Sequence, residues 1–273
     1  METLRIGHSP DPDDAFMFYG FASEQVTLPG HRIKHVLQDI QTLNEWAMGD
    51  DPLEVTALSV HGFLHVHDRY ELLEVGTSVG RNYGPRLIAN REMDLEDLRG
   101  KPVGLPGPFT TPTLVARKLL PGIEEVHMDF TTIMDAVKSG EVAAGVIIHE
   151  GQLTYGAEGF TLLADFGELF AARHNGLPLP LGVNCIRKDL SAALKSTVAD
   201  AYRKSVEIAM KQRDAAVQYS LQFGRGLSTE LADTFVGMYV NEDSLHFNPE
   251  ITAAMDILKT EYWNGALAAS STR

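Results

Sequence analysis

The chain has little cysteine and no long apolar run. A single thiol, Cys185, excludes a disulfide within the 273 residues and is typical of a protein from a reducing compartment. No uninterrupted apolar segment approaches the ~18 residues that a membrane-spanning helix needs. Residues 1–14 also lack the basic and apolar regions of a secretory signal. We therefore expect a cytoplasmic protein with no membrane partner.

Positive charge is also scarce. There are 23 Lys and Arg against 37 Asp and Glu, which gives a formal net charge of −14. No basic run could follow a phosphate backbone, so nucleic acid is not an expected partner. The overall charge repels an anionic ligand, so local groups must hold it. The candidates are helix N-termini and the arginines Arg81, Arg86 and Arg91.

Several motifs of cofactor and metal binding are missing. GLPGPFTT at 104–111 lacks the Lys-Ser/Thr of a P-loop, no GxGxxG follows the first strand, and the GxSxG of serine hydrolases is absent. Asp11, Asp13 and Asp14 match no calcium-loop spacing. The three histidines within 61–67 include an i, i+4 pair but lack the cysteines or HExxH motif of a zinc site. We expect neither a metal nor an organic cofactor.

Apolar strands alternate with helical patterns in two stretches, 1–92 and 93 to about 180, which predicts α/β units with helices covering the sheets. From about 191 to 265 the pattern is helical alone, and such a segment cannot easily form a core by itself. We expect it to pack on the first unit. The predicted lobes are 1–92 with 187–273, and 93–186, with two crossings near 86–91 and 180–187 and a hinged cleft.

Two segments carry the clearest functional signals. The strand at 101–105 leads through a Gly/Pro elbow into a helix that opens with Thr110 and Thr111, where N-terminal N–H groups favour an anion. The apolar strand at 143–148 runs into His149 and Glu150. A titratable imidazole at a strand's carboxyl end lies where open α/β sheets bind ligands. The alternative is a hydrogen-bonded core histidine.

The loop SPDPDD at 9–14 also follows a strand, and we expect it to form part of a cleft wall. The alternative is a structural one, in which Asp13 or Asp14 caps the apolar helix that comes next.

Six segments together resemble the 1,4-dihydroxy-6-naphthoate synthase family of the futalosine route to menaquinone. In chain order they are SPDPDDAFMFYG, DIQTLNEWA, TALSVHGF, GLPGPFTT, GEVAAGVIIHE and GLPLPLGVN, and the resemblance runs from about residue 3 to 250. It implies a two-lobed, periplasmic-binding-protein-like type II fold of the α/β class. The implied activity is that of a lyase that converts cyclic dehypoxanthine futalosine, a small anionic molecule, to 1,4-dihydroxy-6-naphthoate without a cofactor.

The resemblance also assigns roles to residues. In that family the histidine after the apolar strand is the proposed general base, which here is His149. The implied substrate-binding positions are Thr110, Thr111, Asn44, Ser59, Asp13 and Asp14. The family's first loop reads closer to SPCPND, so the SPDPDD of this chain departs from it by two possible negative charges.

Two other functions stay open. A solute-binding protein of a transporter would have the same fold, and the lack of a secretory signal argues against it. The related chorismate dehydratase of the same pathway is the second alternative, and the SPDPDD loop and the IIHE segment at 147–150 point away from it.

Overall fold

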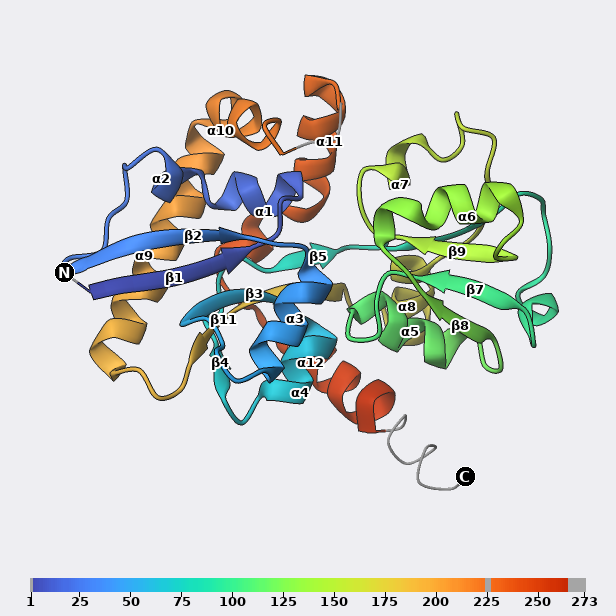
Figure 1. Ribbon diagram of the computed structural model, residues 1–273, viewed down its shortest axis with the longest axis horizontal. Helices are drawn as coiled ribbons and strands as arrows, with labels where there is room; N and C mark the ends of the chain where they lie inside the picture. Colours follow the sequence, from blue (N-terminus) through green and yellow to red (C-terminus); the bar gives the residue numbers. More distant parts are fainter. Residues whose placement is uncertain (1, 224–226, 265–273) are drawn as a thin grey trace. The chain divides into compact units, whose positions relative to one another are not determined.

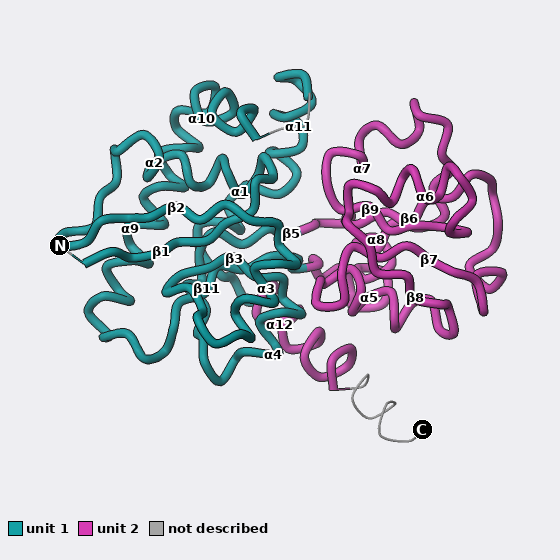
Figure 2. The backbone as a smooth tube through the Cα atoms, viewed as in Figure 1, with its two compact units in different colours: residues 1–79, 180–249 teal, residues 80–179, 250–273 magenta. Residues whose placement is uncertain are grey.

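A computed structural model describes residues 2–223 and 227–264. This part of the chain forms two compact units. Figure 1 labels the helices and strands and colours them along the sequence, and Figure 2 draws the two units in different colours. The first unit contains residues 2–79 and 180–249, and the second contains residues 80–179 and 250–264. No described helix combines the length and the apolar character that crossing a bilayer requires.

The first unit is built on a mixed sheet of six strands. The strand order is β2-β1-β3-β11-β4, and β5 pairs with β11. Strands β1, β2 and β3 are parallel, whereas β11 runs antiparallel to β3 and β4. The strands are β1 (Glu2–His8), β2 (His31–Leu37), β3 (Val55–Ser59), β4 (Tyr70–Leu72), β5 (Ser78–Gly80) and β11 (Leu179–Arg187). The helices are α1 (Pro12–Met17), α2 (Tyr19–Ala22), α3 (Ile40–Met48), α4 (Val60–Val66), α9 (Ala192–Lys211), α10 (Arg213–Ser220), α11 (Thr229–Tyr239) and the short η3 (Glu242–Ser244).

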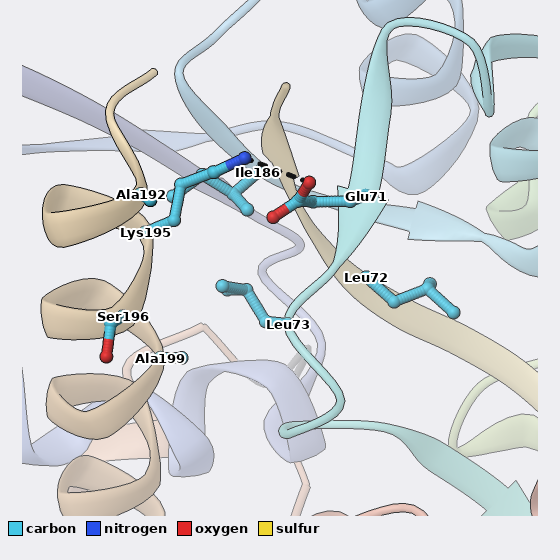
Figure 3. Close-up of a pocket in the computed structure, with 8 residues that line it drawn as sticks. All are labelled: Glu71, Leu72, Leu73, Ile186, Ala192, Lys195, Ser196 and Ala199. Atoms are coloured by element: carbon cyan, nitrogen blue, oxygen red, sulfur yellow. Dashed lines mark hydrogen bonds and ion pairs between the residues drawn. The ribbon is translucent and has the colours of Figure 1, made fainter. Parts of the chain in front are cut away.

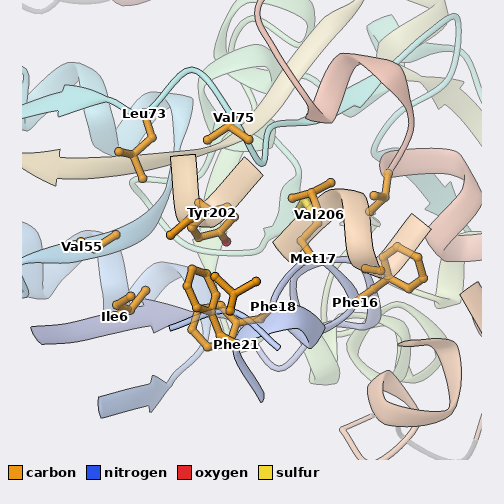
Figure 4. Close-up of a cluster of buried hydrophobic side chains, with 14 of the residues drawn as sticks. Ile6, Phe16, Met17, Phe18, Phe21, Val55, Leu73, Val75, Tyr202 and Val206 are labelled. Carbon is orange, nitrogen blue, oxygen red and sulfur yellow. The ribbon is translucent and has the colours of Figure 1, made fainter. Parts of the chain in front are cut away.

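Successive residues of β1 point to opposite faces of this sheet. Ile6 belongs to a large buried cluster with Phe16 of α1 and Tyr202 of α9, part of which Figure 4 shows. Gly7 points the other way, and a Cβ there would lie 3.0 Å from Leu43 Cδ2 of α3. The glycine therefore lets α3 pack closely on the strand.

Helix α9 is the longest element of the first unit. Its N-cap Ser191 accepts the N–H of Leu194 at 3.2 Å, which satisfies one of the free donors at the helix start. The hydroxyl of Ser205 donates to Met17 O at 2.7 Å, and a Cβ at Gly20 would lie 2.6 Å from Ser205 Cα. These contacts dock α9 against the N-terminal helices.

The second unit has a sheet of five strands in the order β10-β6-β9-β7-β8. Strand β7 is parallel to β8 and β9, and β6 is antiparallel to β9 and β10. The strands are β6 (Arg86–Ala89), β7 (Pro102–Leu105), β8 (Glu124–His127), β9 (Ala144–Ile147) and β10 (Thr161–Asp165). The helices are η1 (Leu95–Leu98), α5 (Thr111–Leu119), η2 (Phe130–Thr132), α6 (Ile133–Ser139), α7 (Gly151–Thr154), α8 (Phe166–Arg173), α12 (Pro249–Ile257) and the π-helix η4 (Leu258–Trp263).

The units differ from the expected lobes at three places. The first boundary lies at 79/80 rather than 92/93, because β6 pairs with β9 and β10 and so belongs to the second sheet. The second lies at 179/180 rather than 186/187 because most of β11 pairs with β3 and β4 of the first sheet. A third passage at 249/250 was not expected, so the chain passes between the units three times.

The end of the described chain belongs to the second unit, contrary to the expectation that all C-terminal helices pack on the first. The hydroxyl oxygen of Tyr262 in η4 lies 3.0 Å from Nε2 of His174. The ring centroid of Tyr262 is 5.8 Å from that of Phe170 in α8. Tyr262 is 3% exposed, so its burial against α8 holds η4 in this unit. Residues 265–273 of the expected first lobe lie outside the described residues.

Candidate functional site

Two of the expected site segments leave the sheet of the second unit side by side. Strands β7 and β9 are parallel neighbours, with Gly104 opposite Gly145. Neighbouring parallel strands end at one edge of a sheet, which is where open α/β proteins bind ligands. The Gly/Pro elbow after β7 and His149 after β9 therefore emerge at the same edge.

Threonine hydroxyls close the elbow. Thr110 donates its hydroxyl to Gly107 O at 3.0 Å, and Thr113 donates to the same oxygen at 2.7 Å. Gly107 has φ 116°, a backbone region that favours glycine. Thr110 is the N-cap of α5 and Thr111 begins the helix, and both are buried. The Thr110 hydroxyl thus shapes the elbow from which α5 begins.

His149 is buried, with an exposed fraction of 8%. Its Nδ1 accepts the backbone N–H of Gly151 at 3.2 Å, and its Nε2 lies 3.4 Å from Phe130 O. The Phe130 ring packs edge-on against the imidazole at a centroid distance of 5.0 Å. Glu150 Oε2 lies 3.4 Å from Nδ1. The ring is therefore held in one orientation by backbone groups on both nitrogens, with a carboxylate beside one of them.

In the first unit, Asn44 and Ser59 are hydrogen bonded to each other. The Ser59 N–H donates to Asn44 Oδ1 at 3.0 Å, and Asn44 Nδ2 donates to Ser59 Oγ at 3.2 Å. Both side chains are buried. Gly62 of α4 makes room for the amide, because a Cβ there would overlap Asn44 Oδ1 and lie 2.5 Å from its Cγ. The structure thus brings these two expected residues together.

Asp13 and Asp14 lie in the first turn of α1, and Asp11 holds the N-cap position without a side-chain cap bond. The capping role considered for Asp13 or Asp14 is therefore not observed. Ser78 donates its hydroxyl to Asp13 Oδ2 at 2.9 Å, and the Ser9 N–H donates to Asp14 Oδ2 at 3.1 Å. Burial, followed by the neighbouring carboxylates, raises the pKa of Asp13 well above 3.8. Burial also raises the pKa of Asp14 to about 6.

Sequence reasoning missed His8 and Ser78. His8 ends β1 and is fully buried, its ring stacks on Phe18 at 4.3 Å, and its Nδ1 lies 2.9 Å from Ser9 O. Burial lowers the pKa of His8 to about 4, so the ring is neutral near pH 7. Within the described chain its Nε2 has no hydrogen-bond partner. The strand-end position could have identified His8, but no sequence spacing connects Ser78 with Asp13.

The histidines of α4 form no metal centre in the described chain. His61 and His65 Nε2 atoms lie 3.2 Å apart. Within residues 2–223 and 227–264, no group of three His, Cys, Asp or Glu side chains is arranged to hold a metal ion. Two of the arginines considered for an anion are in ion pairs inside the second unit: Arg81 with Glu250 at 2.7 Å and Arg86 with Asp165 at 3.4 Å.

A surface cavity of about 320 Å³ lies between β4 and α9 in the first unit (Figure 3). Its walls include Leu73, Ile186 and Ala199, and the ammonium of Lys195 pairs with Glu71 Oε2 at 3.0 Å. None of the expected site residues lines this cavity.

Solved structures define the fold class as periplasmic-binding-protein-like. The ligand-binding component of an ABC-type import system from Staphylococcus aureus matches 97% of this chain and 93% of its own, with a TM-score of 0.72 and 14% identity, which shows the fold alone. Protein AF1704 from Archaeoglobus fulgidus matches 97% of this chain and 98% of its own, with a TM-score of 0.92 and 38% identity.

Sequence comparisons identify the family. A family model described as menaquinone biosynthesis matches residues 4–262. A 1,4-dihydroxy-6-naphthoate synthase from Thermus thermophilus is 37% identical over 273 residues, which is 100% of this chain and 98% of the relative. Another from Streptomyces coelicolor is 36% identical over 266 residues, 95% of this chain and 92% of the relative. The chain belongs to the menaquinone biosynthesis family, which confirms the resemblance drawn from its six sequence segments.

Proposed function

We propose that the chain is a 1,4-dihydroxy-6-naphthoate synthase, a lyase that converts cyclic dehypoxanthine futalosine to 1,4-dihydroxy-6-naphthoate. The observation that carries this proposal is the full-length match to two synthases of that name. The cytoplasm is the proposed location, and the proposed partner is this small anionic substrate.

His149 is the proposed general base. The substrate is a spiro-fused bicyclic molecule that becomes aromatic once a proton leaves its sugar-derived side and that fragment departs. One positioned base in surroundings that exclude water suits such a reaction. The burial of His149 and its position beside the elbow at the carboxyl edge of the second sheet support this role.

Binding is assigned to two groups of residues. In the second unit, the start of α5 at Thr110 and Thr111 binds the substrate carboxylate through backbone N–H groups and the positive end of the helix dipole. In the first unit, the proposed substrate-binding residues are the buried Asn44, Ser59 and Asp13 and the half-buried Asp14. Burial raises the pKa of Asp13, which favours the neutral form of this carboxyl.

The test is a turnover assay with cyclic dehypoxanthine futalosine, with the naphthoate product followed by chromatography. His149→Asn should fold and bind substrate but lose about 10²–10⁴-fold in kcat, as expected on removal of a general base. His127→Asn is the matched control, because His127 lies on β8 of the same unit and its Nε2 bonds to Glu125 at 3.1 Å.

Two outcomes would contradict the proposal. Tight binding of the substrate without product in the wild-type protein would support the solute-binding alternative. A folded His149→Asn variant with nearly full kcat would show that the imidazole has a structural role.

A further inference from the structure

The two nitrogens of the His149 ring have different partners. An amide N–H can only donate, so the Gly151 N–H at 3.2 Å marks Nδ1 as the unprotonated nitrogen of a neutral ring. The remaining ring hydrogen then lies on Nε2, which faces Phe130 O at 3.4 Å. The neutral ring of His149 therefore has one backbone partner at each nitrogen, the Gly151 N–H at Nδ1 and Phe130 O at Nε2.

The protonated form needs a different partner at Nδ1. Once both nitrogens carry hydrogen, the Gly151 N–H opposes the Nδ1 hydrogen instead of donating to that nitrogen. Glu150 Oε2 then lies 3.4 Å from Nδ1 as an opposite charge, while Phe130 O still accepts from Nε2. The imidazolium thus has a carboxylate beside Nδ1 and a hydrogen-bond acceptor at Nε2.

Both members of this pair are removed from solvent. The side chain of His149 is 10% exposed and that of Glu150 is 11% exposed. Attraction between opposite charges at this distance is several-fold stronger in such surroundings than in water. A carboxylate at this position therefore favours the protonated ring over the neutral one.

We propose that Glu150 is a positioning residue for the reaction: its carboxylate, 3.4 Å from Nδ1, forms an ion pair with His149 when the ring takes the substrate proton, and so stabilises the imidazolium. Proton and charge balance in this step, because the proton moves from substrate carbon to the imidazole while Glu150 stays ionised. The inference rests on the proposed function, in which His149 is the base.

Other charged groups surround the pair, and their arrangement leaves Glu150 as the carboxylate placed at Nδ1. The Arg86 guanidinium of β6 donates to Gln152 O of α7 and pairs with Asp165 at 3.4 Å. Asp129, which precedes η2, accepts the Thr131 N–H at 2.8 Å within its own turn. Helix α6, which packs on β9, carries Asp135 and Lys138.

The test compares Glu150→Gln, which keeps the size and removes the charge, with Glu150→Asp, which keeps the charge. Glu158→Gln is the matched control, because Glu158 is an exposed carboxylate nearby in the chain that accepts the Thr154 hydroxyl at 2.8 Å. In Glu150→Gln we expect the acidic limb of the pH profile of kcat/KM to move about one unit to lower pH, since loss of a nearby opposite charge disfavours the protonated ring. The kcat should fall about 3–10-fold because a weaker base is a poorer catalyst.

A second measurement does not depend on turnover. The Cε1 proton of His149, assigned by its loss in His149→Asn, is followed by NMR through a pH titration of the substrate-free protein. Its midpoint should move about one unit to lower pH in Glu150→Gln, stay in place in Glu158→Gln and be largely restored in Glu150→Asp.

The two readouts separate the two proposals. A shifted NMR midpoint without naphthoate formation by any variant would keep the charge pairing and overturn the proposed function. Naphthoate formation with an unmoved midpoint and an unmoved acidic limb in Glu150→Gln would overturn the role of Glu150. If Glu150→Gln fails to fold, Glu150→Asp provides the test. A folded Glu150→Asp whose NMR midpoint and kcat match the wild type supports the role of the carboxylate charge at position 150, and one whose midpoint and kcat both differ from the wild type overturns it.

Discussion

The carboxylates of α1 should control how the stability of this protein depends on pH. Asp13 is 8% exposed and lies beside Asp14 and Asp11, and Ser78 donates to it at 2.9 Å. Burial and these neighbours raise the pKa of Asp13 well above 3.8, and the pKa of Asp14 rises to about 6. The folded protein therefore holds protons in this pair at pH values where the unfolded chain has released them.

The sign of the effect follows from proton binding. Above about pH 4 the folded state binds more protons than the unfolded state, so the free energy of unfolding falls as the pH rises. The stabilisation is fully present below about pH 4 and is lost as the pH rises through the raised pKa values. For Asp14, the change from 3.8 to about 6 corresponds to ~3 kcal/mol at about 1.4 kcal/mol per unit. Because the two carboxyls interact, this energy belongs to the pair.

Asp13→Asn removes one carboxyl and keeps an oxygen that can accept from Ser78. Its free energy of unfolding, measured by urea denaturation, should increase relative to the wild type as the pH rises above about 4, because the variant has no Asp13 charge to bury. Asp200→Asn is the control for net charge, because Asp200 is an exposed carboxylate of α9 that pairs with Arg203 at 3.1 Å. A difference between Asp13→Asn and wild type that does not change with pH would refute the reasoning, as would the same pH dependence in the Asp200 variant.

Two further substitutions test packing. Gly62→Ala should displace the Asn44 amide, whose Cγ would lie 2.5 Å from the new Cβ, and leave buried polar groups unsatisfied. We expect a loss of ~1–3 kcal/mol in urea denaturation and a raised KM, and an unchanged KM would argue against a substrate role for Asn44. Phe16→Ala should cost ~3–5 kcal/mol, because Phe16 is fully buried in the main cluster of the first unit, and a midpoint close to wild type would contradict that packing.

Local sequence patterns were sufficient to predict the elements that hold the candidate site. The elbow and the helix after it were readable because glycine, proline and threonine each restrict the backbone there, and α5 begins at Thr111 as expected. The strand before His149 was readable because it is a short apolar run, observed as Ala144–Ile147. These signals act over a few residues, so one sequence contains them.

Contacts between distant segments could not be predicted in the same way. The bond from Ser78 to Asp13 joins residues 65 positions apart, and the contact of Tyr262 with His174 joins residues 88 positions apart. Nothing in the helical pattern of the C-terminal segment shows which sheet its apolar side chains will meet. The assignment of 250–264 to the first lobe failed for this reason, since amphipathic periodicity indicates that a face is buried and does not specify its partner.

The position of His149 depends on Gly145, a residue without a side chain. Gly145 of β9 leaves space for α6, because a Cβ there would lie 2.9 Å from Val137 and would overlap Ile133. Helix α6 follows η2 directly, and η2 begins with Phe130, whose carbonyl faces the imidazole at 3.4 Å. The close approach of α6 to the strand therefore places the acceptor for Nε2. A glycine four residues before His149 thus contributes to the geometry that orients the imidazole.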